Sequence, residues 1–371
     1  MTENIPVPFN ELKPKVQAHR AAIDRAIARV LDRGWFILGP EVEAFEKELA
    51  SAMGAREAVS VANGTDALIL ALEVKGIGPG DEVITSPMSA AFSALAISRL
   101  GARPVFGDVD PVTMNLDPST IEALITPRTR AIMPVHLYGH PADMDPIMDI
   151  ARRHGLVVVE DACQAHAARY KGHPVGHLAG IAGLSFYPTK NLGAFGDGGA
   201  ILVNDSALAG RLRQLRNGGQ SEKYRHEILG TNSRLDDMQA AILRELLHTL
   251  DAETARRREI AERYFEAFRG LPLGLPEEQA YARAVYHLFV VKHPRRAAFV
   301  AALAARGVGT AIHYPLPLHL QPAYASLGGK RGDRKVVERA ADEIVSLPVY
   351  PELSDAQVGA VIAAVKESVN A

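Results

Sequence analysis

The stretch Gly183-Leu-Ser-Phe-Tyr-Pro-Thr-Lys190-Asn-Leu-Gly-Ala-Phe-Gly-Asp-Gly198 places one lysine in a glycine-rich turn, directly after a run that is typical of a buried strand. Pro188 ends this run, and the glycines allow the backbone to pass close to a neighbouring group. A second strand pattern follows at Gly199–Val203, so the segment predicts a hairpin with Lys190 near its tip. Most lysines in loops are simply solvated, so a chemical role for Lys190 depends on other segments.

A carboxylate ends the strand pattern that precedes this hairpin. The β-branched run Leu156–Glu160 continues into Asp161, as in a parallel strand buried on both faces. Ligands bind at the carboxyl ends of such strands. There Asp161 can pair with a protonated ring nitrogen, and Gln164 can hydrogen-bond a neighbouring ring hydroxyl. The alternative is that Asp161 only caps the helix that follows.

A third segment predicts a phosphate site. Asn63, Gly64 and Thr65 connect a strand pattern to an apolar helix pattern. Asn63 is a favourable N-cap residue, Gly64 lets an anion approach the backbone, and the free amides of the first helical turn attract a phosphate. Taken alone, this is a common capped turn.

The three segments together supply a lysine for a Schiff base, a carboxylate for a pyridinium nitrogen and a helix N-terminus for a phosphate. This combination is what pyridoxal 5'-phosphate (PLP) requires of a protein. At this point the chain resembles the DegT/DnrJ/EryC1/StrS family of PLP-dependent nucleotide-sugar aminotransferases, from about residue 34 to about residue 353. The segments that carry the resemblance are Leu38–Glu46, Asn63–Leu68, Gly78–Val83, Pro134–Gly139, Glu160–His166, Ser185–Gly193, Asn232–Ala241 and His313–His319.

The resemblance implies a role for individual residues around the cofactor. Lys190 would form the Schiff base, Asp161 would face the ring nitrogen and Gln164 would contact the ring hydroxyl. The phosphate would be held by Gly64, Thr65 and Ser185, and by Asn232 from the neighbouring subunit, which implies a homodimer with shared active sites.

One position departs from the family pattern. Family members usually place an aromatic side chain over the cofactor ring, and the aligned position here holds Ala90. Two outcomes are open. Either Phe92 or Met88 takes its place, or the face of the ring is open.

The resemblance also implies the reaction, in which an amino group passes from glutamate to a keto group of a nucleotide-linked deoxysugar. The segments near residues 230 and 313 favour amination at the sugar C3 over C4. Arg216, Arg225 and Arg234 are candidates for the diphosphate, and the residues expected around the sugar are Tyr187, Tyr224, His313, Tyr314 and His319.

Two other functions are considered. The first is a pyridoxamine-dependent sugar dehydratase of the same family, in which the resemblance expects histidine in place of Lys190. The second is a regulatory protein that binds the cofactor and has lost turnover. The presence of every expected catalytic group favours the aminotransferase over both.

Composition sets limits on partners and location. The chain has 371 residues, 47% of them hydrophobic, and a formal net charge of −2. The near-neutral charge predicts no binding to nucleic acid or anionic membranes, and no apolar run approaches the roughly 20 residues of a membrane span. The single cysteine, Cys163, suits a reducing cytoplasm. The histidines form no convincing metal-ligand pattern, so we expect no metal. Together with the cysteine content, the absence of a membrane span predicts a cytoplasmic enzyme.

Strand and helix patterns alternate between residues 58 and 203, which predicts an α/β fold with a mostly parallel sheet flanked by helices. The resemblance makes this the fold type I of PLP transferases, with a seven-stranded sheet in a large domain (1–250) and a smaller C-terminal α/β domain (251–371). Residues 235–268 form one helical pattern, broken at most once. Strands are expected at Ala58–Val61, Glu82–Ser86, Arg103–Asp108, Ala131–Leu137, Leu156–Glu160, Gly183–Tyr187, Gly199–Val203, Val285–Val291 and Val308–His313. Helices are expected at Val16–Leu31, Glu41–Met53, Thr65–Val74, Met144–His154, Ala207–Leu215, Arg295–Ala305 and Asp333–Ile344.

Overall fold

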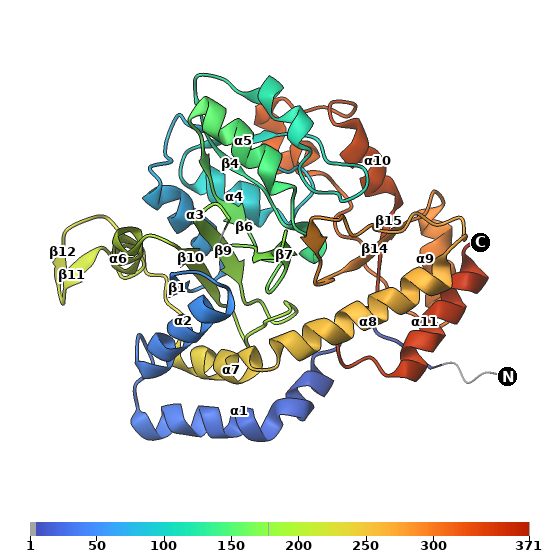
Figure 1. Ribbon diagram of the computed structural model, residues 1–371, viewed down its shortest axis with the longest axis horizontal. Coiled ribbons are helices and arrows are strands. Elements are labelled where there is room, and N and C mark those ends of the chain that lie inside the picture. The colour runs from blue at the N-terminus through green and yellow to red at the C-terminus, as the bar shows by residue number, and fades with distance from the viewer. Residues whose placement is uncertain (1–4, 177, 371) are drawn as a thin grey trace.

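The computed structural model describes residues 5–176 and 178–370 and is shown in Figure 1. The α-helices are α1 (Lys13–Arg33), α2 (Pro40–Ala52), α3 (Gly64–Val74), α4 (Phe92–Arg99), α5 (Met144–His154), α6 (Ser206–Leu215), α7 (Asp237–Leu247), α8 (Leu250–Phe268), α9 (Arg296–Ala304), α10 (Lys335–Glu343) and α11 (Asp355–Ser368). Short 3-10 helices lie at Pro118–Thr120, Glu122–Leu124, Leu137–Gly139, Leu318–Leu320 and Pro322–Leu327.

The strands fall into a large central sheet and several small ones. The central strands are β1 (Glu57–Val61), β2 (Glu82–Thr85), β3 (Arg103–Phe106), β4 (Thr129–Met133), β5 (Val157–Val158), β6 (Glu160–Asp161), β9 (Ile181–Ser185) and β10 (Gly199–Val203). The others are β7 (Arg169–Tyr170), β8 (His173–Pro174), β11 (Gln220–Glu222), β12 (Arg225–His226), β13 (Ala282–Arg283), β14 (Phe289–Lys292) and β15 (Ile344–Leu347).

The central sheet has the predicted seven strands, because β5 and β6 are successive parts of one extended segment. β5 pairs with β4 on one side, and β6 pairs with β9 on the other. The amides of Val159 and Asp161 continue the ladder to the carbonyls of Ile132 and Pro134, at 3.1 and 2.9 Å. The strand order is therefore β3-β2-β4-β5/β6-β9-β10-β1.

Only β10 runs against the other strands of this sheet. It pairs antiparallel with both β9 and β1, while β2, β3, β4 and β5 pair in parallel. The hairpin predicted around Lys190 is thus confirmed as β9, a loop and β10. Parallel strands place their carboxyl ends at one edge, so the segments after β1, β6 and β9 emerge together.

Alternation along the strands sends apolar side chains to both faces of the sheet. Val59, Val61 and Ile201 pack on one face with α3 and α6. Ala58 and Leu202 point to the other face, in the cluster that includes side chains of α2, α5 and α7. Both faces are buried, as expected for a mostly parallel sheet.

The long helical pattern ends and restarts once, as predicted. α7 ends at Leu247 and α8 begins at Leu250, and α8 then runs across the molecule to the C-terminal part of the chain (Figure 1). There Tyr264, Phe268 and Phe289 are completely buried in a separate apolar cluster with α9 and α11. A domain boundary near residue 250 stays a prediction.

Several expectations about smaller elements need correction. The strand expected at Val308–His313 is wrong, because this segment forms only isolated bridges, Val308 with Val7 and Ala311 with Ser346. Sequence patterns missed α4, the hairpin β11–β12, the small sheet β13-β7-β8 and strand β15. They also missed α11, although Ser354 and Gln357 form a capping box at its start.

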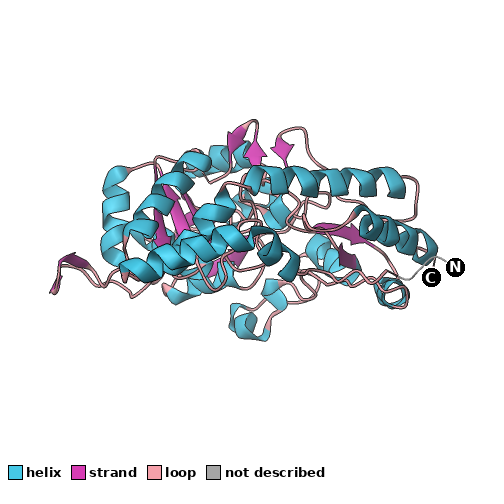
Figure 2. Ribbon diagram, turned by 90° about the horizontal axis from the view of Figure 1, so that it is seen from below, coloured by secondary structure: helices cyan, strands magenta, loops and turns pink. Residues whose placement is uncertain are grey.

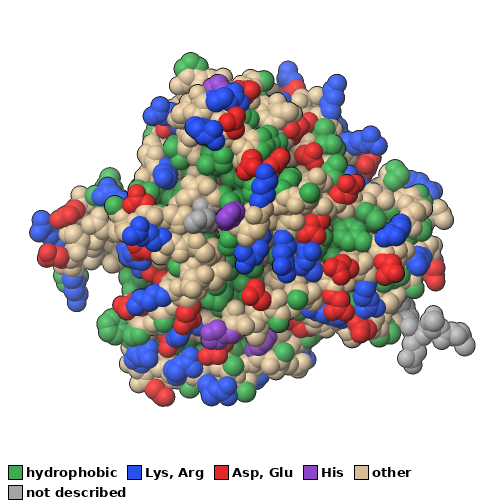
Figure 3. Space-filling model, viewed as in Figure 1, with side chains coloured by type: hydrophobic (Ala, Val, Ile, Leu, Met, Phe, Trp, Pro, Cys, Tyr) green, Lys and Arg blue, Asp and Glu red, His purple; other side chains and the backbone are tan. Residues whose placement is uncertain are grey.

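The described part of the chain can be compared with the features expected of a membrane span and of a metal site. No helix in residues 5–176 or 178–370 combines the length and apolarity needed to cross a bilayer. The same residues hold no group of three or more histidine, cysteine or acidic side chains placed for a metal ion. On the face shown in Figure 3, acidic and basic side chains are interspersed.

Candidate active site

The three segments singled out in the sequence meet at one edge of the central sheet. A Cβ atom added to Gly64 would lie 2.6 Å from the Cβ of Ser185 and 3.1 Å from the Sγ of Cys163. The first distance is too short for real atoms, so only glycine fits there. The start of α3, the end of β9 and the loop after β6 are therefore in contact.

The start of α3 offers free backbone donors. The Oδ1 of Asn63 accepts a hydrogen bond of 2.9 Å from the amide of Asp66, as the predicted N-cap. The amides of Gly64 and Thr65 make no hydrogen bond within the described residues. Unpaired amides at a helix N-terminus attract anions. This end of α3 can therefore hold a phosphate, with Ser185 beside it.

The segment that contains Asn232 lies close to this helix start in space, although it is far away in the sequence. The adjacent Ser233 is buried, donates a 2.6 Å hydrogen bond to the Oδ2 of Asp66 and accepts one of 3.0 Å from the amide of Ala62. Asn232 itself is exposed and pairs through its backbone with Asn217. Its side chain is therefore open to solvent or to a second molecule.

Lys190 lies in the loop between β9 and β10. Its amide closes a turn onto the carbonyl of Tyr187 at 2.8 Å, and a Cβ on Gly193 would lie 2.4 Å from the carbonyl oxygen of Pro188. The lysine is half-buried, and within the described residues its Nζ makes no hydrogen bond. Burial lowers the pKa of Lys190, an effect opposed by the nearby Cys163 and Asp161. Lys190 therefore loses its proton to become a neutral amine more readily than a solvated lysine does.

Asp161 is buried at the end of β6 and is held by two donors. Its Oδ2 accepts a hydrogen bond of 2.6 Å from the hydroxyl of Ser93, and its Oδ1 accepts one of 3.2 Å from the amide of Cys163. The carboxylate has lone pairs left for a further donor. The sequence pointed to Asp161 but not to Ser93, which stands in an alanine-rich segment without a distinctive pattern.

Gln164 links two aromatic residues. Its Oε1 accepts from the amide of Tyr138 at 2.8 Å, and its Nε2 donates to the hydroxyl of Tyr314 at 3.0 Å. The hydroxyl of Tyr138 donates in turn to the carbonyl of His313. Burial raises the pKa of Tyr314 to about 12, while burial and the charge of Lys190 lower the pKa of His313 to about 4. Both side chains are therefore uncharged near neutral pH.

The structure separates the residues expected around the sugar. His313 and Tyr314 lie near Gln164 and Lys190, and Tyr187 is exposed three residues before Lys190. Tyr224 is 82% exposed on the hairpin β11–β12, which projects from the body of the protein in Figures 1 and 2. His319 is only 5% exposed, with its Nε2 3.0 Å from the Oε1 of Glu338. Neither Tyr224 nor His319 joins the site of its own chain.

The candidate arginines also differ in their surroundings. Arg216 is buried, where its guanidinium donates to the carboxylate of Glu46 and, at 2.7 Å, to the carbonyl of Ser60. It is occupied by the protein itself, which argues against a diphosphate contact. Arg225 is exposed on β12, and Arg234 donates to the Oδ1 of Asn217 at 3.1 Å.

Met88 and Phe92, the two side chains considered in place of the missing ring, differ in exposure. Met88 is completely buried in a cluster with Val135 and Leu137. Phe92 is more than half exposed at the start of α4. Met88 therefore presents no free surface to a cofactor ring, whereas Phe92 does, and a role for Phe92 stays a prediction.

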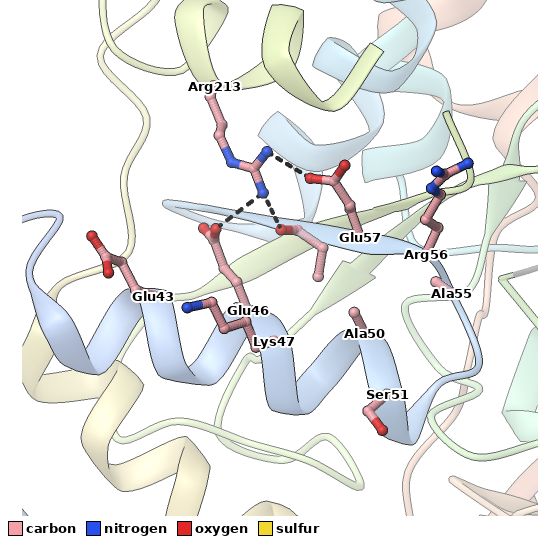
Figure 4. Close-up of a pocket in the computed structure, with 10 residues that line it drawn as sticks. Glu43, Glu46, Lys47, Ala50, Ser51, Ala55, Arg56, Glu57 and Arg213 are labelled. Carbon is pink, nitrogen blue, oxygen red and sulfur yellow. Dashed lines mark hydrogen bonds and ion pairs between the residues drawn. The ribbon is translucent and has the colours of Figure 1, made fainter. Parts of the chain in front are cut away.

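A hollow of about 600 Å³ lies at the other end of β1 (Figure 4). Arg213 reaches into it from α6 and pairs with Glu57 at 2.7 Å and, more loosely, with Glu46 at 3.7 Å. Both acids are thus already neutralised by the protein. Because Asn63 and Gly64 follow the opposite end of β1, this hollow is separate from the residues around Lys190.

With the geometry in place, the chain can be compared with known proteins. The sequence profile of the DegT/DnrJ/EryC1/StrS aminotransferase family matches residues 17–366. This chain belongs to that family. It is 51% identical to a dTDP-3-amino-3,4,6-trideoxy-alpha-D-glucose transaminase of Streptomyces venezuelae, over 97% of this chain and 96% of the relative. It is an aminotransferase with the fold described above.

Two further family members support this assignment. A UDP-2-acetamido-2-deoxy-3-oxo-D-glucuronate aminotransferase of Pseudomonas aeruginosa is 44% identical over 96% of this chain and 99% of its own. The solved structure of S. venezuelae DesV in complex with a ketimine intermediate superposes with a TM-score of 0.97 at 50% identity, covering 99% of both chains. The fold type I arrangement predicted from the sequence is thus confirmed.

Proposed function

We propose that this family member uses PLP to transfer an amino group, from glutamate, to the C3 keto group of a nucleotide-linked deoxysugar. The observation that carries the proposal is the meeting of Lys190, Asp161 and the free amides at the start of α3. Of the two relatives described above, one is named for a 3-amino sugar and the other for a 3-oxo sugar, and both sugars are linked to a nucleotide, which supports C3 over C4.

The residues present fit PLP by their chemistry. The open amides of Gly64 and Thr65 suit its phosphate, and the spare lone pairs of the buried Asp161 suit a protonated ring nitrogen. Gln164 can reach a ring hydroxyl, and the Nζ of Lys190 is free to hold the aldehyde covalently. When bound, PLP supplies an electron sink for negative charge beside the transferred nitrogen.

The side chains of this protein would move the proton, keep the ring nitrogen protonated and border the substrates. The Nζ of Lys190 would take a proton from the donor carbon that bears the amino group and deliver it to the C4′ carbon of the cofactor, a role helped by its lowered pKa. Asp161, fixed by Ser93, keeps the facing ring nitrogen protonated. His313 and Tyr314, both uncharged, border the space left for the substrates. Donor and acceptor would use the same site in turn, which predicts ping-pong kinetics.

We also infer a homodimer with shared active sites in the cytoplasm. A contiguous segment, Trp35–Ile37, leaves three large apolar side chains exposed, and Leu229 beside the projecting hairpin is 95% exposed. Large exposed apolar side chains in a group favour a subunit interface. Asn232 and Tyr224, exposed in their own chain, would then serve the site of the second copy.

A spectroscopic experiment tests the proposal. Purified protein should show the visible absorption of bound PLP, and glutamate should bleach it. Lys190→Ala should lose both properties while keeping the fold. A protein that binds PLP but does not respond to any amino acid would support the regulatory alternative. Release of water from a keto-sugar mixed with the bleached, pyridoxamine form, without transfer of an amino group to the sugar, would support the dehydratase.

The sugar can then be identified with the same signal. The bleached protein is mixed with nucleotide-linked 3-keto and 4-keto sugars, one at a time. We expect a 3-keto compound to restore the visible absorption fastest. Restoration only by 4-keto compounds would overturn the C3 assignment and leave the aminotransferase class intact.

A further inference from the structure

The residue next to Lys190 is tied to a distant segment of the chain. Asn191 is buried, its Nδ2 donates a hydrogen bond of 3.1 Å to the carbonyl of Val285, and its Oδ1 lies 3.2 Å from the Nδ1 of His287. Its own carbonyl is 3.5 Å from the Nζ of Lys15, a buried lysine of α1 paired with Glu253. The backbone at Lys190 is therefore anchored on one side by residues 285–287.

These contacts determine which nitrogen of His287 carries a proton. The carbonyl of Val285 can only accept, so the amide of Asn191 must present its Nδ2 to it. Its Oδ1 then faces His287 and needs a donor, which places the proton on Nδ1. His287 is buried beside Lys190 and Arg257, and burial together with these charges keeps its pKa well below 6.5. The ring is thus neutral, with a defined tautomer.

The same segment reaches the other side of the candidate site. The amide of Val285 donates to the carbonyl of Gly139 at 3.0 Å, and the amide of Leu288 donates to that of Tyr138 at 3.3 Å. The amide of Tyr138 is the donor to the Oε1 of Gln164. A Cβ on Gly139 would lie 2.9 Å from the backbone nitrogen of His287, so the two backbones are in direct contact. Residues 285–288 therefore connect the loop of Lys190 with Gln164.

We propose that His287 and Asn191 are positioning residues. Through the segment 285–288 they hold the loop that carries Lys190 at a defined position relative to Gln164. This rests on the proposed function of Lys190. His287 itself would not take part in proton transfer. Its Nδ1 proton holds Asn191, and Asn191 holds the backbone from which the lysine side chain extends. A misplacement of about 1 Å at a reacting group can cost up to about 100-fold in rate.

The experiment compares two substitutions of one histidine in the protein loaded with PLP. In His287→Asn, the amide nitrogen can replace the Nδ1 donor, whereas in His287→Gln the donor is displaced by one methylene. We expect His287→Gln to lower kcat by up to about 100-fold with little change in KM, and His287→Asn to recover most of the loss. Asn191→Leu should resemble His287→Gln.

Two readouts separate positioning from a general loss of stability. The pH midpoint of the visible absorption should shift in His287→Gln and return in His287→Asn. Hydrogen exchange in the cofactor-free protein should accelerate by about five- to tenfold at residues 186–194, because one hydrogen bond is lost there. The matched control is His293→Gln, a buried histidine held by the carbonyl of Val369 and the amide of Arg295, which should leave the midpoint and this exchange unchanged.

The outcomes are distinguishable. If His287→Asn and His287→Gln behave alike, or if both match His293→Gln, the positioning role is overturned. Lys190→Ala is measured in parallel. If it keeps the absorption and turnover, the proposed function fails; if it loses both while the His287 variants match the unmodified protein, only the positioning role fails.

Discussion

The hydroxyl of Ser93, in the first turn of α4, donates a hydrogen bond of 2.6 Å to the Oδ2 of Asp161, at the end of β6. Both side chains are buried, and the Oγ of Ser89 lies 2.9 Å from that of Ser93. A hydrogen bond to a buried carboxylate contributes more than one between neutral groups. Ser93 therefore fixes the direction in which Asp161 presents its remaining lone pairs.

Replacing Ser93 by alanine should destabilise the protein by about 2 kcal/mol, because Asp161 loses a buried donor. Ser93→Thr keeps the hydroxyl and should recover most of this loss. Urea unfolding of the cofactor-free protein measures the free energy. Equal stability of Ser93→Ala and the unmodified protein would show that the bond is not important for the fold.

Gly64→Ala should destabilise the fold by about 1–3 kcal/mol and weaken phosphate binding. The added methyl group would lie 2.6 Å from the Cβ of Ser185, so the start of α3 must move. Gly210→Ala is the matched control, because a Cβ there meets no atom within 4 Å in the middle of α6. It should stabilise the protein by up to about 1 kcal/mol. Thermal unfolding measures the change in stability, and PLP titration measures the change in affinity. If Gly64→Ala and Gly210→Ala change the stability in the same direction, the steric argument is contradicted.

Two neighbouring aspartates should differ sharply. Asp237 is completely buried and accepts from the amides of Gly39, Glu41 and Val42, at 2.6, 2.9 and 3.1 Å, across the start of α2. Asp237→Ala should cost about 3 kcal/mol or more, since these amides lose a charged partner. Asp236 is exposed and its side chain makes no capping bond to α7. Asp236→Ala should change the stability by less than about 0.5 kcal/mol in the same denaturant series.

Acid should destabilise the protein partly through His166. Burial lowers its pKa to about 3, and neither ring nitrogen has a hydrogen-bond partner among the described residues. Between its ordinary pKa of about 6.5 and the folded value, the unfolded chain binds a proton that the folded chain does not. Stability should therefore fall as the pH is lowered through this window, by about 1.4 kcal/mol per pH unit from this group.

His166→Leu removes that proton and should reduce the slope between pH 6 and pH 4.5 by about this amount. A slope remains, because burial also lowers the pKa of His140 and His313. Urea unfolding at a series of pH values is the measurement. An unchanged slope in His166→Leu would mean that His166 is not buried in its neutral form.

Local sequence patterns predicted the central sheet well for a physical reason. The apolar runs that end at Val61, Asp161 and Ser185 are buried on both faces, so their hydrophobicity does not depend on their neighbours. The expected strand at Val308–His313 failed because a strand needs a partner along its whole length. There the chain meets Val7 and Ser346 at single bridges only.

The candidate site residues also fall into those that stand in a local sequence pattern and those whose surroundings depend on distant segments. The local structures at Gly64 and Lys190 could be predicted, because each residue stands in a short-range pattern, a capped helix start and a glycine-rich turn between two strands. His319 could not be placed, because its burial depends on Glu338 in a helix that begins sixteen residues later. Tyr224 was expected beside the sugar in a site shared between subunits. Its hairpin leaves the body of its own subunit, so its place at such a site depends on a second copy and stays a prediction.

The sequence by itself determined the fold class, the family resemblance, and the lysine, the carboxylate and the helix start around which a PLP site can form. Only the tertiary structure decided that Ser93 holds Asp161 and that His287 holds Asn191 beside Lys190. Periodicity and turn chemistry act over a few residues, so they can be read along the chain. Hydrogen bonds between segments 68 and 96 residues apart depend on how the packed elements place each side chain in space.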